Sequence, residues 1–88
     1  MFYTYIIGSL SHPTQRYICY TKELRQRLAA HNAGQCQHTS KYVPWKIKVY
    51  IAFETIDQAQ HFEGYLKSGS GHVFATRHFW GTRGDQRR

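Results

Sequence analysis

The stretch WKIKVYIAF, residues 45–53, decides the fold, because it is the clearest β-strand in the sequence. Apolar residues occupy every second position and share one predicted face: Trp45, Ile47, Val49, Ile51 and Phe53. The opposite face carries Lys46, Lys48 and Tyr50. A period of two residues is that of a strand with one buried face, so this stretch predicts a strand that packs on its apolar side.

Two segments upstream predict partners for this strand. FYTYIIG at 2–8 and RYICY at 16–20 are rich in residues that favour β-structure. The connection between them, GSLSHPTQ at 8–15, contains the Gly, Ser and Pro that are typical of turns. Because this connection is short, we expect the two segments to form an antiparallel hairpin.

A first helix is expected between the hairpin and the strand at 45–53. Thr21 is a suitable cap for a helix that runs from Lys22 to about Asn32. Gly34 is a suitable residue to end it, because glycine readily adopts the left-handed conformation found after helices.

Two further helices are expected after the strand. Thr55 and Gln58 fit a capping box for a helix that runs to about Lys67, and a short helix follows at about 72–78. The order of elements is therefore ββαβαα. This order predicts an α+β fold, a small three-stranded antiparallel sheet flanked by helices.

Length and charge limit the classes of protein that this chain can represent. Its 88 residues exclude a two-domain enzyme, and its 41% of hydrophobic residues support a folded core. Twelve Lys and Arg against five Asp and Glu give a formal net charge of +7. Such a surface attracts polyanions, with nucleic acid as the first candidate and an anionic membrane surface as the second.

Residues 1–80 are expected to form one domain, and residues 81–88, GTRGDQRR, a basic and flexible tail. Cys19 and Cys36 are too few for a disulfide scaffold and fit a reduced compartment. No apolar run reaches the ~20 residues of a membrane span, and the N-terminus lacks the features of a signal peptide. We therefore expect a cytoplasmic protein that does not associate with membranes.

Two polar side chains lie beside the apolar face of the first predicted helix. In a projection at ~100° per residue, Leu24 and Leu28 define that face, and Arg27 and His31 fall next to it. We therefore expect Arg27 and His31 to point toward the sheet. An arginine placed there needs an anionic partner, unless its aliphatic stem carries the charge out to solvent.

Glu63 falls within the apolar stripe of the second predicted helix. The stripe consists of Ile56, Ala59, Phe62 and Leu66. A carboxylate in that position needs a cation, which can be a lysine, an arginine or a metal ion, and internal pairing with Arg27 is the simplest solution. An arginine, a histidine and a carboxylate are also what a site that cleaves phosphodiesters requires, because arginine stabilises the charge on phosphate and a carboxylate holds Mg²⁺.

Tyr5 and Tyr17, on the first two predicted strands, complete this set. A phenol is a usable proton acceptor only if its pKa falls from the ordinary value of about 10. Nearby positive charge lowers a phenol pKa, and Arg27, His31 and a metal ion are the candidates for that effect.

The motifs around these side chains resemble those of the GIY-YIG nuclease superfamily, in particular its small single-domain members. The five side chains follow one another in the order Tyr5, Tyr17, Arg27, His31 and Glu63. YTYII at 3–7 is similar to the first motif, with Tyr-Thr in place of Gly-Ile, and Tyr17-Ile18-Cys19 is similar to the second, Tyr-Ile-Gly. HNAG at 31–34 resembles the end of the family's first helix, and FEGYLKSGSG at 62–71 its second-helix segment. The resemblance covers about residues 2–79.

This resemblance implies a metal-dependent DNA endonuclease, with a role in DNA repair or recombination, in which water attacks the phosphodiester. Tyr5 would take the proton of the water as general base, with His31 polarising or relaying, and Tyr17 would position the water or the phosphate. Arg27 would stabilise the pentacoordinate transition state. One Mg²⁺ or Mn²⁺ on Glu63 would neutralise the leaving 3′ oxygen.

Cys19 stands where the second motif of the family has glycine. A thiol there can crowd Tyr17 or the scissile phosphate, since glycine allows the closest approach. A catalytically weak or inactive nucleic-acid-binding module of the same fold is therefore the alternative. A basic RNA-binding module is another, although no aromatic-rich RNP or GXXG element supports it.

Basic residues outside these motifs are candidates for contacts with the DNA backbone. They lie in the loop at 35–44, on the strand at 45–53 and one turn after Glu63: His38, Lys41, Lys46, Lys48 and Lys67. A solvated surface explains the first four equally well, and an ordinary helix pair with Glu63 explains Lys67. The expected partners are DNA and a protein that supplies targeting, and the expected state is a monomer or weak dimer.

Overall fold

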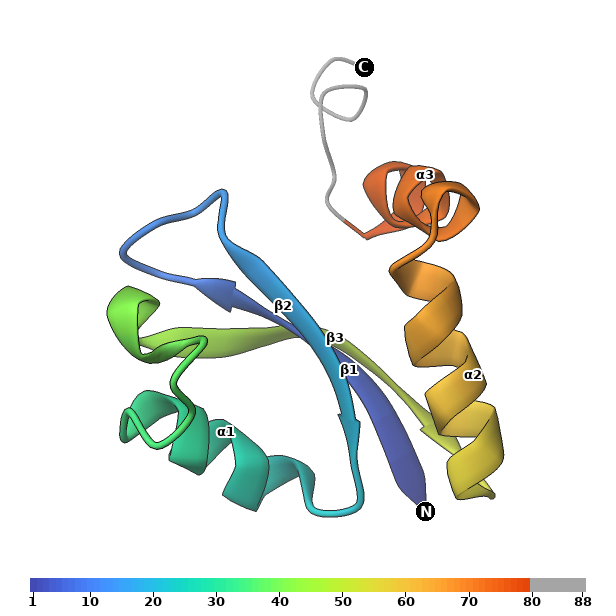
Figure 1. Ribbon diagram of the computed structural model, residues 1–88, viewed down its shortest axis with the longest axis horizontal. Coiled ribbons are helices and arrows are strands. Elements are labelled where there is room, and N and C mark those ends of the chain that lie inside the picture. Colours follow the sequence, from blue (N-terminus) through green and yellow to red (C-terminus); the bar gives the residue numbers. More distant parts are fainter. Residues whose placement is uncertain (80–88) are drawn as a thin grey trace.

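A computed structural model describes residues 1–79 of the chain (Figure 1). The expected order ββαβαα and the α+β class are confirmed. The elements are β1 Phe2–Ser9, β2 Arg16–Thr21, α1 Leu24–Asn32, a 3₁₀ turn Ser40–Tyr42, β3 Trp45–Phe53, α2 Ile56–Leu66 and α3 Gly69–His78. The predicted tail at 81–88 lies outside the described residues.

The three strands form one antiparallel sheet in the order β2-β1-β3. The predicted hairpin is the β1–β2 pair, in which Tyr5 lies opposite Cys19. On its other side β1 pairs with β3, and Tyr5 lies opposite Tyr50. The first strand in sequence is therefore the central strand, and β2 is an edge.

The helices cover the two faces of this sheet separately (Figure 1). On one face, Tyr5, Ile7 and Trp45 form a buried cluster that packs with Leu24 and Leu28 of α1. On the other face, the buried residues are Ile6, Leu66 and Ala75, and they bring α2 and α3 against the sheet. Neighbouring side chains of β1 thus enter two different cores, because successive side chains of a strand point to opposite faces.

A β-bulge in β3 corrects the single apolar face predicted for this strand. Ile6 pairs with Val49, whereas the next residue, Ile7, pairs with Ile47, so Lys48 is an extra residue in the ladder. As a result, Ile47 packs in the α1 core and Val49 in the α2 core. Burial still alternates along β3 as expected. The apolar positions do not share a face, because a bulge exchanges the faces on its two sides.

The start of α1 differs from the prediction by two residues. The helix begins at Leu24, because the hydroxyl of Thr21 accepts a hydrogen bond from the backbone N–H of Glu23 (3.1 Å) in the turn before the helix. Thr21 itself is still part of β2. It therefore shapes the turn between strand and helix and does not cap the helix.

The end of α1 is as predicted. Gly34 has a φ of 77°, the left-handed conformation that favours glycine. Its backbone N–H donates to the carbonyl of His31 (3.1 Å), and the N–H of Gln35 donates to the carbonyl of Ala30 (3.0 Å). These two bonds form a Schellman motif, which satisfies carbonyls that the helix leaves unpaired.

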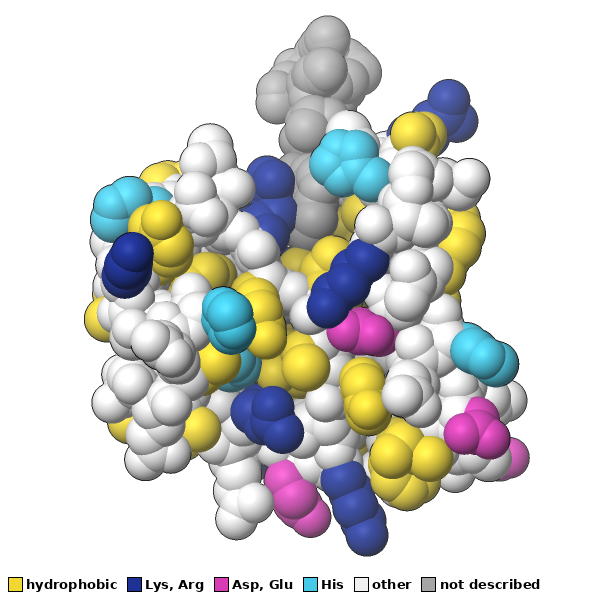
Figure 2. Space-filling model, in the orientation of Figure 1, with side chains coloured by type: hydrophobic (Ala, Val, Ile, Leu, Met, Phe, Trp, Pro, Cys, Tyr) yellow, Lys and Arg dark blue, Asp and Glu magenta, His cyan; other side chains and the backbone are white. Residues whose placement is uncertain are grey.

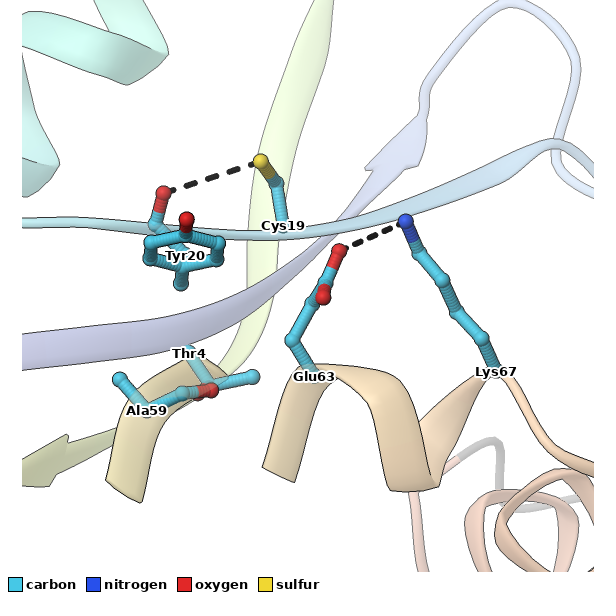
Figure 3. A network of polar contacts seen from close by, with 6 residues as sticks. All are labelled: Thr4, Cys19, Tyr20, Ala59, Glu63 and Lys67. Carbon is cyan, nitrogen blue, oxygen red and sulfur yellow. Dashed lines mark hydrogen bonds and ion pairs between the residues drawn. The ribbon is translucent and has the colours of Figure 1, made fainter. Parts of the chain in front are cut away.

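Local hydrogen bonds also fix the start of α2 and hold the helix on the sheet. The capping box of Thr55 and Gln58 is confirmed, with both bonds at 3.2 Å. The buried hydroxyl of Thr4 donates to the carbonyl of Ala59 (2.7 Å), and Figure 3 shows the two residues in contact between β1 and α2. This bond gives a structural role to Thr4, which stands where the first motif described above has isoleucine.

The last helix, α3, begins three residues earlier than predicted. The hydroxyl of Ser68 accepts from the N–H of Gly71 (3.2 Å) and caps the helix. A Cβ at Gly71 would collide with the backbone of Tyr65 and Leu66. Glycine at this position therefore allows α3 to turn tightly against the end of α2.

Candidate active site

A buried chain of polar groups lies between the sheet and α1. The hydroxyl of Tyr5, on the central strand, is 3.0 Å from Nε2 of His31, in the last turn of α1. Nδ1 of the same ring is 2.8 Å from the hydroxyl of Thr39, in the loop that follows α1. Each of the three residues is 1% exposed. Two ring nitrogens and two hydroxyls therefore satisfy one another in a buried position.

The direction of each proton follows from the end of this chain. The hydroxyl of Thr39 donates its hydrogen to the carbonyl of Cys36 (3.4 Å). Its oxygen is then free to accept from Nδ1–H of His31, so that Nε2 carries no proton. Nε2 therefore accepts from the Tyr5 O–H. The geometry assigns a neutral His31 that is protonated on Nδ1.

The pKa values of these groups agree with this assignment and correct one expectation. Burial raises the pKa of Tyr5 well above 10, and Cys19 adds to that effect, although the nearby charge of Arg27 opposes it. Arg27 therefore lowers this pKa as expected, but burial outweighs its effect and the net change is a rise. Burial lowers the pKa of His31 below 6.5, and Arg27 lowers it further. At neutral pH Tyr5 keeps its proton and His31 is uncharged.

Tyr17 borders the same histidine from the edge strand. Its ring packs edge-on against the ring of His31, with centroids 5.4 Å apart. The side chain is half-buried, and burial raises its pKa. Tyr5 and Tyr17 thus flank one imidazole, one from the central strand and one from the edge.

Cys19 lies opposite Tyr5 in the sheet and packs in the same cluster as Tyr17. Its thiol donates to the carbonyl of Tyr20 at 3.7 Å, as Figure 3 shows. A glycine at this position would leave room beside the two tyrosines that the thiol fills.

Arg27 does not point into the interior, contrary to the expectation from the helical projection. Its side chain is exposed, and it forms no ion pair with a carboxylate of residues 1–79. Its charge nevertheless acts on the groups of the site. It adds to the effect of burial that lowers the pKa of His31, and it opposes the effect of burial that raises the pKa values of Tyr5 and Tyr17. The guanidinium therefore stands at the rim of the buried chain, where an anionic ligand can reach it.

Glu63 is paired with Lys67 and not with Arg27. The carboxylate is 2.7 Å from the ammonium of Lys67, and the side chain of Glu63 is 17% exposed. Figure 3 shows both side chains reaching toward β2 from α2. The ammonium of Lys67 also acts on Tyr17, whose pKa it lowers against the larger effect of burial. The ion pair therefore lies at the same edge of the sheet as Tyr17.

Among residues 1–79, no group of three or more His, Cys, Asp or Glu side chains is close enough to hold a metal ion. Glu63 offers one carboxylate, a hard oxygen donor of the kind that Mg²⁺ and Mn²⁺ prefer. Mg²⁺ is commonly held by one or two carboxylates, with water and substrate phosphates completing its shell. The donor set at this edge therefore fits such an ion when water or a phosphate ligand completes its shell.

The other basic residues named from the sequence are all exposed, but they do not gather in one place. His38 and Lys41 lie in the loop that contains Thr39, on the side of α1. Lys46 pairs with Gly8, and the stem of Lys48 lies over Gly8, so both belong to β3 at the opposite edge from β2. Figure 2 shows Lys and Arg side chains dispersed around hydrophobic side chains on one face.

A groove of about 460 Å³ adjoins Arg27. It crosses the end of β2 between α1 and the start of α2, and its apolar part includes Phe2, Tyr20 and Ile56. Ile56, predicted in the apolar stripe of α2, is 46% exposed and borders this groove. Lys22 and Gln26 supply polar groups on its α1 side. The dimensions are those of a small-ligand site.

Three residues that support the site were not identified from the sequence. Thr39 fixes the ring of His31 and had no sequence signal. The side-chain amide of Asn32 bonds both the backbone N–H and the carbonyl of Trp45, and the indole N–H of Trp45 donates to the carbonyl of Thr39 (2.9 Å). The HNAG segment could have indicated Asn32, since it follows His31 directly. Together these bonds join α1, β3 and the Thr39 loop into one frame.

Comparison with known proteins gives a family match. The family model of the GIY-YIG catalytic domain matches residues 1–75, and no curated protein matches the chain. No helix within residues 1–79 is long and apolar enough to cross a membrane.

Proposed function

The chain belongs to the GIY-YIG family, whose members are typically endonucleases that use a divalent metal, and from this premise we propose that it is a metal-dependent DNA endonuclease. The observation that carries the proposal is the buried chain from Tyr5 through His31 to Thr39. A phenol whose proton points at a neutral imidazole is suited to proton transfer. The reaction is the hydrolysis of a phosphodiester bond by water.

The proton of the attacking water passes through Tyr5 in two coupled movements. The phenol oxygen accepts a proton from water while its own proton moves to Nε2 of His31, 3.0 Å away. No free phenolate forms, which is consistent with the raised pKa of Tyr5. The imidazolium that results keeps its Nδ1–H bond to Thr39. Tyr5 is thus the general base and His31 the final proton acceptor.

Arg27 and Tyr17 act on the phosphate. Arg27 is exposed at the rim and lacks an acidic partner among residues 1–79, so its guanidinium is available to two phosphate oxygens. It stabilises the charge that grows on these oxygens in the transition state. Tyr17, between His31 and the edge of the sheet, positions the water or the phosphate.

Glu63 holds the metal ion in this proposal, and the bound Mg²⁺ or Mn²⁺ supplies charge stabilisation for the leaving 3′ oxygen. The carboxylate is paired with Lys67, whose ammonium acts on Tyr17. A single carboxylate suffices because substrate oxygens complete the shell.

The groove beside Arg27 receives the nucleotide next to the scissile phosphate. Arg27 belongs both to the rim of the buried chain and to the lining of the groove, so a phosphate at Arg27 places its neighbour there. Tyr20 and Phe2 offer aromatic surface for a base. His38 and Lys41 contact the backbone on the other side of α1, whereas Lys46 and Lys48 contribute only to DNA that reaches the far edge of the sheet.

The proposal is tested with supercoiled plasmid, incubated with Mg²⁺, with Mn²⁺ and with chelator. The wild type nicks the plasmid only with metal, and Glu63→Ala removes the activity. His61→Ala, at an exposed position on the same helix, is the matched control and keeps it. Binding of DNA without nicking in any metal contradicts the proposal.

Cys19 supports a second candidate, a module of the same fold that binds nucleic acid without cutting it. The thiol packs beside Tyr5 and Tyr17, where the family motif has glycine. In that case Cys19→Gly restores nicking to a protein that binds but does not cut. If the wild type nicks plasmid, this candidate is eliminated.

A further inference from the structure

The carboxylate of Glu63, which is proposed to hold the metal ion, already forms an ion pair with a side chain of the protein. Lys67 lies one helical turn after Glu63, with its Nζ 2.7 Å from Oε2 of Glu63. The carboxylate side chain is 17% exposed, whereas that of Lys67 is 52% exposed. The lysine therefore has solvent around it into which it can move, whereas the glutamate is mostly covered by protein.

Lysine and a divalent metal ion compete for this carboxylate. Two cations on the oxygens of one carboxylate lie only a few ångströms apart and repel each other strongly at a partly buried site. Metal binding to Glu63 therefore displaces the ammonium of Lys67. The released ammonium needs another anion, and it already acts electrostatically on Tyr17, beside which the scissile phosphate is proposed to lie.

We propose that Lys67 exchanges partners during substrate binding, from the carboxylate of Glu63 in the free protein to a phosphate oxygen of DNA in the loaded protein. The proposal rests on the proposed function, because it assumes that Glu63 holds the metal. It makes Lys67 a phosphate-binding residue that also lowers the metal affinity of the DNA-free protein. DNA and metal then bind cooperatively, since each removes an obstacle to the other.

This exchange has a reciprocal consequence. If DNA raises the affinity for metal by a certain factor, metal raises the affinity for DNA by the same factor. Without Lys67, DNA raises the metal affinity less and metal raises the DNA affinity less, because no cation has to leave the carboxylate of Glu63. An ordinary helix pair that takes no part in DNA binding predicts no such coupling between DNA and metal.

The first experiment measures Mn²⁺ binding to the DNA-free protein by isothermal titration calorimetry and by electron paramagnetic resonance of free Mn²⁺. Lys67→Met is expected to raise the affinity at least about threefold, the order of a partly exposed ion pair. Lys67→Arg retains the competing charge and stays near the wild type. Arg25→Met, which removes one exposed positive charge from α1, is the control for net charge and changes the affinity little.

The second experiment measures the affinity for a labelled DNA duplex by fluorescence anisotropy, with and without Ca²⁺, over times in which gels show no cleavage product. In the wild type Ca²⁺ tightens DNA binding. In Lys67→Met the tightening is at least about threefold smaller, and DNA binding with Ca²⁺ is weaker because one phosphate contact is lost.

Equal Mn²⁺ affinity and equal Ca²⁺-dependent tightening in Lys67→Met and wild type overturn the exchange. Glu63→Gln separates that result from failure of the proposed function. If Glu63→Gln abolishes Mn²⁺ binding while Lys67→Met does not change it, the metal site stands and the exchange is wrong. If Glu63→Gln binds Mn²⁺ as the wild type does, the metal role of Glu63 itself is wrong.

Discussion

The two faces of the sheet differ in what they bury, although both pack on the same central strand. The α1 face buries a hydrogen-bonded chain of Tyr5, His31 and Thr39 among aromatic rings. The α2 face buries Ile6 and Leu66, with Thr4 as its one fully buried polar side chain among residues 1–79. Neighbouring residues of β1 thus differ in purpose: Ile6 contributes to stability, and Tyr5 to the proposed chemistry.

This contrast has an energetic reason. Apolar side chains stabilise a small domain by leaving water, and they need no fixed proton positions. Buried polar groups stabilise it only when every donor and acceptor has a hydrogen-bond partner. Those hydrogen bonds then fix the tautomer of a buried histidine. A chain of only 88 residues has room for both cores because the three-stranded sheet separates them. Substitutions within the two buried cores therefore have separable effects.

The largest effect is expected on the α1 face, from Tyr5→Phe. The phenylalanine fills the same space but removes the hydroxyl that accepts the proton of water. Cleavage is expected to fall by about 10²–10⁴-fold, the usual contribution of general acid–base catalysis. Single-turnover plasmid nicking measures the loss. Tyr65→Phe, a partly exposed tyrosine of α2, is the control, and equal rates in the two variants would exclude Tyr5 from proton transfer.

The opposite outcome is expected on the α2 face, from Leu66→Ala. Leu66 is 2% exposed and joins α2 to the core below it, so truncation lowers the free energy of unfolding by about 2–5 kcal/mol. Chemical denaturation measures the change. Below the unfolding temperature the rate of cleavage per folded molecule remains that of the wild type. A loss of rate as large as that of Tyr5→Phe would show that the two faces are not separable.

A smaller effect is expected from Thr39→Val, which acts on cleavage through His31. Valine has nearly the shape of threonine but cannot accept from Nδ1–H, so the preferred tautomer is lost. We expect cleavage to fall by about tenfold, within the range seen for residues that orient a catalytic group. Thr39→Ser keeps the hydroxyl and recovers most of the rate. A Thr39→Ser rate as low as that of Thr39→Val would assign the loss to packing.

The smallest effect concerns the pH dependence of stability. Because the pKa of His31 is lowered on folding, the unfolded chain binds more protons between that lowered pKa and 6.5. The contribution of His31 to stability should therefore fall as the pH decreases from 6.5 and change little above it. Urea titrations at several pH values measure this, and His31→Gln should flatten the dependence. His61→Gln, exposed on α2, should leave it unchanged.

The fold could be predicted where local signals act alone. The Thr55–Gln58 capping box and the Gly34 helix end use interactions between residues close in sequence, and both are present. The bulge at Lys48 could not be predicted, because both faces of the sheet are covered and apolar residues suit either core. The alternation along β3 therefore predicts which of its residues are buried, but not which face of the sheet each of them covers.

The site was predicted less completely than the fold. Burial of His31 follows from its helical position, but the same projection misplaced Arg27, since a long side chain can follow the helix surface to solvent. Thr39 reaches His31 across a loop eight residues later, and no periodicity describes a loop. The Glu63–Lys67 pair was predictable from spacing alone.

The position of the proton on the His31 ring tests the proposed proton relay from Tyr5 most directly. Long-range ¹⁵N–¹H correlation spectra of the free protein report which ring nitrogen carries hydrogen, and a pH titration of the same signals gives the pKa. We predict a neutral ring protonated on Nδ1 at pH 7, with a pKa below 6.5. A ring protonated on Nε2, or charged at pH 7, could not accept the proton of Tyr5 and would contradict the mechanism.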